Sequence, residues 1–205
     1  PTKLAKSGVK ALAQQAKSGI IGQNSSKEIP EVGKTSAPHK PASMRDVTEE
    51  YLNSSTPNSH VVQDLHTYVV NGTAYTVDGH NVVLDYSPHE KEVAELLEKE
   101  LGGEIFMVPR INSPEGISTP DYLFRGEAYD LKTLGPEAGK NTIYNRIKKA
   151  RRQAENFVVD ISQANFEEAI IDEQIEKIYR MKETTFVDKV IFVDKGQIVK
   201  IVRRT

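Results

Sequence analysis

The chain has 205 residues, and this length has room for one ordinary domain and an appendage. Of these residues, 38% are hydrophobic and 27% are charged. It contains no cysteine, which excludes disulfide bonds, thiolate metal sites and cysteine nucleophiles and leaves oxygen or imidazole to bind any metal. No apolar run approaches the roughly 20 residues of a membrane-spanning helix, so we expect no membrane span.

The first part of the chain differs in composition from the remainder. Residues 1–45 contain 8 Lys and Arg against 2 Asp and Glu, whereas residues 46–205 contain 19 against 27. The first part is also rich in proline and poor in large apolar residues, so it buries too little surface to offset the entropy of ordering it. We therefore predict a flexible linker or delivery-associated segment over residues 1–59, with one short helix around Leu4–Gln15, and a folded domain over residues 60–205.

Three short runs of β-forming residues open the predicted domain. They are His66–Val70, Thr73–Val77 and His80–Tyr86, and the dipeptides Asn71-Gly72 and Asp78-Gly79 separate them. Asn-Gly and Asp-Gly readily adopt the positive φ angles of two-residue hairpin turns. The pattern predicts a small β meander.

A helix start follows at Ser87-Pro88-His89-Glu90, with Ser at the N-cap, Pro at the first helical position and Glu at the third. We expect this helix to run to Leu101 and to stop at Gly102-Gly103. Glu90 shares the apolar face of the helix and should point inward, although Ser-x-x-Glu is also a capping box, in which the Glu only satisfies a backbone N–H.

A strand over Glu104–Val108 precedes a predicted hairpin, whose arms Asp121–Phe124 and Glu127–Lys132 are joined by Arg125-Gly126. A two-residue turn places Asp121 opposite Asp130. Since side chains alternate along a strand, Asp130 and Lys132 share a face. Two carboxylates opposite each other are unfavourable unless a cation joins them. The alternative is an ordinary turn carboxylate beside an exposed, salt-bridged strand face.

The remaining elements complete the fold. Apolar spacing predicts a helix over Thr142–Phe157, a strand near Val158–Ile161, a helix over Phe166–Arg180 and a hairpin with arms Val187–Val193 and Gln197–Val202. The predicted fold class is α/β, with a restriction-endonuclease-like core of helix, three strands, helix and strands around a mixed sheet, preceded by the meander and the linker.

The acidic hairpin suits the hydrolysis of phosphodiesters. That reaction needs an activated water and charge relief on the phosphate oxygens, both of which a divalent metal supplies. Mg²⁺ is bound in proteins through a few carboxylates and keeps several waters. Two carboxylates with a lysine beside them therefore predict a metal-dependent phosphodiesterase.

Pro120-Asp121, eight further residues and Asp130-Leu131-Lys132 resemble the PD-(D/E)xK motif of restriction-endonuclease-like nucleases. With His89-Glu90 before this motif and Gln153-Ala154-Glu155-Asn156 after it, residues 85–203 resemble the CdiA-type C-terminal tRNA nuclease toxins of contact-dependent growth inhibition. Asp in place of Glu in the last acid-x-Lys is a mild departure.

This resemblance implies that Glu90, Asp121 and Asp130 hold a divalent metal and that Lys132 orients or activates water. Mg²⁺ is expected, with Mn²⁺ or Zn²⁺ as alternatives. It also implies a toxin that cleaves tRNA in the cytoplasm of competing bacteria, delivered from a longer secreted or cell-surface protein and neutralised by a cognate immunity protein. The first residue is Pro1 rather than Met, which agrees with a piece of a longer chain.

The second predicted helix is strongly basic, with six basic and no acidic residues over 140–152. Clustered cations bind phosphates without reading sequence. The predicted nucleic-acid-binding residues are Arg146, Lys148, Lys149, Arg152 and Gln153. Three alternatives remain: a solvated helix face, a DNase of the same fold, and a non-catalytic interaction or delivery module.

Overall fold

This computed structural model describes residues 43–77 and 79–205. The predicted helix around Leu4–Gln15 and the turn residue Asp78 lie outside this range. The helices are α2 (Thr48–Ser54), α3 (Pro88–Leu101), α4 (Thr142–Lys149) and α5 (Glu168–Arg180), with a 3₁₀ turn at Lys182–Thr184. The strands are β1 (Met44–Asp46), β2 (Val62–Asp64), β3 (Thr67–Val70), β4 (Thr73–Thr76), β5 (Val82–Val83), β6 (Ile105–Met107), β7 (Arg110–Ile111), β8 (Tyr122–Phe124), β9 (Glu127–Thr133), β10 (Asn156–Asp160), β11 (Lys189–Asp194) and β12 (Gln197–Arg204).

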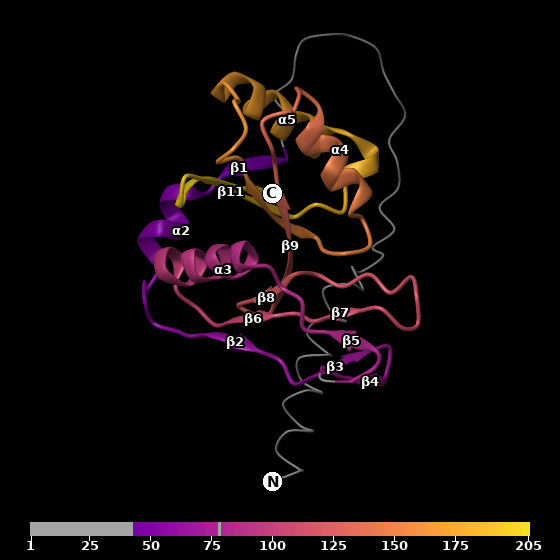
Figure 1. Ribbon diagram of the computed structural model, residues 1–205. Helices are drawn as coiled ribbons and strands as arrows, with labels where there is room; N and C mark the ends of the chain where they lie inside the picture. The colour runs from indigo at the N-terminus through magenta and orange to yellow at the C-terminus, as the bar shows by residue number, and fades with distance from the viewer. Residues whose placement is uncertain (1–42, 78) are drawn as a thin grey trace.

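The architecture is mixed α/β, as predicted. One eight-stranded sheet has the order β1-β12-β11-β10-β9-β8-β6-β2, and β3-β4 and β5-β7 form two small sheets beside it (Figure 1). In the large sheet β10 runs parallel to both β9 and β11, while β8 is antiparallel to β9 and β6. None of the helices over the described residues has the length and apolarity to cross a bilayer.

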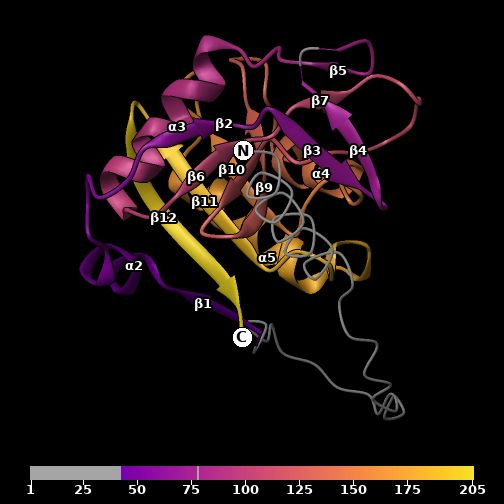
Figure 2. The same ribbon diagram turned by 90° about the horizontal axis from the view of Figure 1, so that it is seen from below.

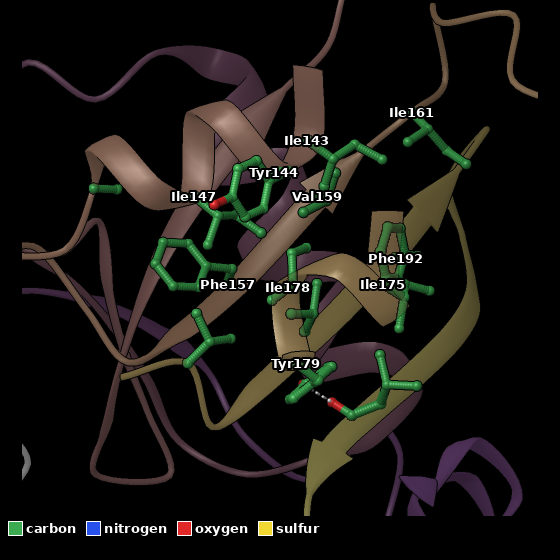
Figure 3. Packing of buried hydrophobic residues seen from close by; sticks show 14 of the residues in the cluster. Ile143, Tyr144, Ile147, Phe157, Val159, Ile161, Ile175, Ile178, Tyr179 and Phe192 are labelled. Atoms are coloured by element: carbon green, nitrogen blue, oxygen red, sulfur yellow. Dashed lines mark hydrogen bonds between the residues drawn. The ribbon is translucent and has the colours of Figure 1, made fainter. Parts of the chain in front are cut away.

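Helices cover both faces of the large sheet. The apolar side of α3 packs on one face, where Tyr129 and Val158 belong to the same buried cluster as Leu97. On the other face α4 and α5 pack side by side over Phe157, Val159 and Phe192 (Figure 3). Because neighbouring strand residues alternate between the two clusters, β10 is buried on both faces, as is typical of a parallel strand inside an α/β sheet.

Local sequence signals set the elements around the site. The predicted capping box of α3 is present: Ser87 Oγ accepts from the N–H of Glu90, and Glu90 accepts from the N–H of Ser87. The helix stops at Gly102, whose φ of 62° suits glycine. Between β8 and β9, Arg125 and Gly126 both have positive φ, so the predicted two-residue turn is confirmed.

The second helix is shorter than predicted. The N–H of Ala150 donates to both Arg146 O and Ile147 O, which tightens and ends α4. Phe157 therefore lies on β10 rather than on the helix. Its spacing resembled a helical stripe because α4 and β10 bury their apolar side chains in the same cluster.

The predicted meander is only half formed. β3 and β4 pair around Asn71-Gly72, as expected. The third run contributes β5, which pairs with β7 through Val82 and Ile111 instead of with β4. Both side chains are buried in a third apolar cluster, so a more distant partner prevails over the next strand in sequence.

Residues 44–54, placed in the linker by their composition, form β1 and α2. β1 is antiparallel to β12 at one edge of the large sheet (Figure 2). Val47 is 2% exposed and its N–H donates to Ile201 O. So short a segment is ordered here because it adds to an existing sheet edge and needs no core of its own. The division into linker and toxin domain stays a prediction.

Candidate active site

The candidate site lies at the point along β9 where its pairing with β8 ends. β8 pairs with β9 from Glu127 to Tyr129, and β10 pairs with it from Tyr129 to Thr133. Beyond Tyr129 no strand among residues 43–77 and 79–205 pairs with the β8 side of β9. The next residues of β9, beginning with Asp130, therefore line an open sheet edge.

Just before β8 begins, hydrogen bonds of Asp121 to the β9 backbone stand in place of strand pairing. The register of β8 and β9 is as predicted, with Phe124 opposite Glu127, but the ladder ends one residue short of Asp121. There the N–H of Asp121 donates to Tyr129 O at 3.0 Å, and its Oδ2 accepts from the N–H of Leu131 at 2.7 Å. The carboxylate thus caps an unpaired edge amide and turns toward the carboxyl group of Asp130.

Asp130, which is buried, and Lys132, which is partly buried, form an ion pair on the side of the sheet that α4 covers. The side chain of Asp130 is 1% exposed, and Lys132 Nζ contacts its Oδ2. Lys132 Nζ also lies 3.4 Å from Gln153 Oε1, just beyond the end of α4. As predicted from strand alternation, Leu131 packs toward the opposite face.

The charges of this cluster do not balance. Burial, followed by the negative charge of Asp121, raises the pKa of Asp130 to about 7 despite the neighbouring Lys132. Burial is also the main cause that raises the pKa of Asp121, with Glu90 adding to the effect. One buried and one partly buried carboxylate share one ammonium, so full ionisation at neutral pH requires a further cation.

Glu90 reaches the same cavity from the first turn of α3. Its Oε2 accepts from the N–H of Ser87 at 2.8 Å, and its Oε1 accepts from Arg110 Nη2 at 2.7 Å. The capping interpretation of this residue is therefore confirmed. Across the described part of the chain, no group of three or more acidic or histidine side chains is placed to hold a metal. The structure brings Asp121 and Asp130 together and leaves Glu90 bonded elsewhere.

The donor set nevertheless suits a hard divalent cation. Asp121 and Asp130 supply two adjacent carboxylates where β9 has no strand neighbour on its β8 side, and their unbalanced negative charge attracts a cation. The cavity around them has a volume of about 420 Å³, enough for an ion with its waters. We call it the carboxylate cavity; it is lined by Glu90, Arg110, Ile111, Asn112, Ile117, Ser118, Thr119, Asp121, Asp130, Leu131, Lys132 and Gln153.

A second cavity adjoins the first. It is lined by Ser118, Lys149, Arg151, Arg152 and Gln153 and is called the basic hollow below. Ser118 and Gln153 line both cavities, so the hollow continues from the carboxylates toward the end of α4.

Two predicted nucleic-acid-binding residues lie outside these cavities. Arg146 donates to Thr133 O at 2.7 Å, and Lys148 pairs with Glu183 at 3.5 Å. Sequence reasoning proposed no role for Arg110 or Ser118. Neither residue belongs to a recognisable local sequence motif. Arg110 reaches the site only through the pairing of β7 with β5.

Comparison with known proteins bears on this geometry. Residues 118–199 match the family of the contact-dependent growth inhibition CdiA C-terminal domain. This CdiA C-terminal match includes Asp121, Asp130, Lys132 and the basic hollow. The chain is also similar to a solved CdiA-CT/CdiI toxin and immunity complex from Burkholderia pseudomallei, at 20% sequence identity and a TM-score of 0.40, over 70% of this chain and 99% of that one. No curated protein matches the sequence.

Proposed function

We propose that this chain is a CdiA-type C-terminal toxin domain, and that its toxic activity is metal-dependent cleavage of tRNA by a restriction-endonuclease-like nuclease. The observation that carries this proposal is the buried carboxylate of Asp130 beside the partly buried carboxylate of Asp121, with one ammonium, inside the segment that matches the CdiA C-terminal family. An ordinary salt-bridged strand face is exposed and balanced in charge. This cluster is neither.

The side chains have separate roles in this proposal. Asp121 and Asp130 would hold the metal, which supplies charge relief for the phosphate and lowers the pKa of a bound water. Lys132 lowers the pKa of Asp130 against the effect of burial, and it would offer its ammonium to the attacking water or to a phosphate oxygen. Gln153 fixes the direction of Lys132.

The basic hollow supports a polyanionic substrate. Lys149, Arg151 and Arg152 stand next to the carboxylate cavity, where they would contact phosphates flanking the cleaved bond. The choice of tRNA over DNA rests on the resemblance to CdiA-type toxins, because contacts to phosphates do not distinguish the two.

The same surface suits an inhibitor. A cell that makes such a toxin needs a protein that blocks it, and we propose a cognate immunity protein whose acidic residues cover the basic hollow. The chain would reach the cytoplasm of a competing bacterium as part of a longer protein that the producer secretes or displays.

The decisive experiment incubates the purified chain with tRNA and, separately, with plasmid DNA, in Mg²⁺, Mn²⁺ or EDTA. We expect cleavage of tRNA with metal, none in EDTA and none by Asp130→Asn. Asp85→Asn is the matched control, since Asp85 is exposed and away from the cavity. Cleavage that survives in EDTA would overturn the metal dependence, and cleavage of plasmid alone would make the protein a DNase.

A further inference from the structure

Arg110 is the one basic residue of the carboxylate cavity that comes from outside the α4 region and β9. It lies on β7, which β5 holds in place through the pair Val83 and Arg110. Its side chain is 54% exposed, while that of Glu90, its partner, is 15% exposed. The guanidinium therefore stands at the mouth of the cavity, held at one end by a partly buried carboxylate.

Only part of the guanidinium is used by that contact. Nη2 donates to Glu90 Oε1 at 2.7 Å, and the other donors have no acceptor among residues 43–77 and 79–205. The positive charge also acts on Asp121, whose carboxylate lines the same cavity. An arginine with unused donors beside two carboxylates has the geometry to bind a phosphate oxygen, for which its planar fork is suited.

The contacts of Glu90 explain why it does not join the two aspartates. One of its oxygens accepts from the N–H of Ser87 and the other from Arg110. Turning either oxygen toward Asp121 would break the helix cap or leave Glu90 without its cation. Both oxygens are committed to holding the start of α3 and the guanidinium.

We propose that Arg110 is a substrate-contacting residue that binds a phosphate next to the cleaved bond, and that Glu90 is the positioning residue that holds Arg110 there, instead of a third metal ligand. This inference rests on the proposed nuclease function. It places two cationic arms around the carboxylates: Arg110 on one side and the basic hollow on the other, with the substrate backbone passing between them.

The first test measures tRNA binding in EDTA, where no metal contributes. Arg110→Ala is expected to bind roughly tenfold more weakly than the unaltered chain, in line with the loss of a charge-assisted hydrogen bond. Arg110→Lys should recover part of the affinity, since it keeps the charge and loses the fork. Arg180→Ala, at an exposed position on α5, is the matched control. Equal affinity of Arg110→Ala and the unaltered chain would overturn the role of Arg110.

The second test measures Mn²⁺ binding by calorimetry without substrate. Glu90→Gln keeps the capping box, because glutamine also serves at that position. It should bind Mn²⁺ within about twofold of the unaltered chain, as should the control Glu95→Gln on the same helix, whereas Asp130→Asn should lose binding. A loss of Mn²⁺ binding in Glu90→Gln as large as in Asp130→Asn would show that Glu90 is a ligand.

The third test is a double-mutant cycle on tRNA cleavage. If Glu90 acts through Arg110, Glu90→Gln lowers kcat/KM, and adding it to Arg110→Ala lowers it no further. Independent, multiplying losses would overturn the positioning role. Failure of the nuclease proposal looks different: the unaltered chain would then cleave nothing with any metal, while the binding measurement in EDTA would still report on Arg110.

Discussion

Two carboxylates of strand β9 pair with lysines, and the two pairs have similar contacts but a different balance of charge. Near its start Glu127 accepts from Lys189 Nζ at 2.6 Å, and further along Asp130 pairs with Lys132. Lys189 is 1% exposed, and its ammonium also donates to Tyr129 Oη at 2.9 Å and lies over the ring of Tyr51. Both pairs are built into the same sheet.

The difference lies in the balance of charge. Burial alone would raise the pKa of Glu127, but Lys189 lowers it below its ordinary value. At Asp130, burial and the second carboxylate prevail over Lys132 and raise the pKa to about 7. Glu127 and Lys189, one acid and one base with aromatic neighbours, connect α2, β9 and β11. Two acids with one base leave unbalanced negative charge, which is why we propose a metal site at Asp121 and Asp130.

The largest difference between the two pairs is expected in the cleavage rate when Asp130 is replaced. If the proposed function holds, Asp130→Asn should lower the rate of tRNA cleavage by at least about a thousandfold, because the loss of a proposed metal ligand would remove several kcal/mol of transition-state stabilisation. Lys189→Met, measured well below its melting temperature, should cleave normally. Normal cleavage by Asp130→Asn would show that the Asp130–Lys132 pair has no catalytic role.

The opposite result is expected for stability. Lys189→Met leaves Glu127 without its cation and should lower the free energy of unfolding by about 2 kcal/mol, measured by chemical denaturation. This is less than for a fully buried pair, because the side chain of Glu127 is 45% exposed and water can reach it. Lys182→Met, at an exposed site, should have little effect. An unchanged unfolding midpoint for Lys189→Met would refute its structural role.

The pH dependence of stability sharpens the contrast further. The pKa of Asp130 rises from 3.8 to about 7 on folding, so the metal-free folded state binds the extra proton and loses stability as the pH increases from about 4 to about 7. In EDTA, Asp130→Asn should therefore melt at a temperature several degrees above the unaltered chain at pH 8, and the gap should shrink toward pH 5. A gap that widens toward pH 5 would contradict this assignment.

The smallest effect is expected in the basic hollow. Replacing Lys149 and Arg152 by alanine should weaken tRNA binding modestly and reduce the slope of log affinity against log salt by about 1 for each residue. Lys182→Ala, outside the hollow, should leave the slope unchanged. If both variants shift the slope equally, tRNA does not pass along this hollow.

Short-range signals predicted the arrangement of Asp121, Asp130 and Lys132 correctly, whereas their catalytic role stays a prediction. The Arg125-Gly126 turn fixes the register, which brings Asp121 next to Asp130, and strand alternation puts Lys132 beside Asp130. The capping box and the glycine stop bound α3 correctly. All of these depend on residues within about ten positions of each other, where turn geometry and periodicity act directly.

Features that depend on distant partners were missed. The sequence around Arg110 contains no sign that β7 pairs with β5, and the composition of residues 44–54 resembles a linker. α4 was extended too far because a buried strand followed it with matching apolar spacing. In each case tertiary packing decided among local structures that the sequence left nearly equivalent.

The addition of β1 to β12 bears on how the protein can be shortened for study. Trimming the chain at the predicted linker boundary, after residue 59, would remove the three residues that pair with Val202, Arg203 and Arg204, together with Val47 and its hydrogen bond to Ile201 O. β12 would then present bare amides and carbonyls beside Val199, which is already 47% exposed. An unpaired strand edge of this kind can pair with the same edge of another copy of the chain, so we expect the solubility of the trimmed protein to fall before its activity does.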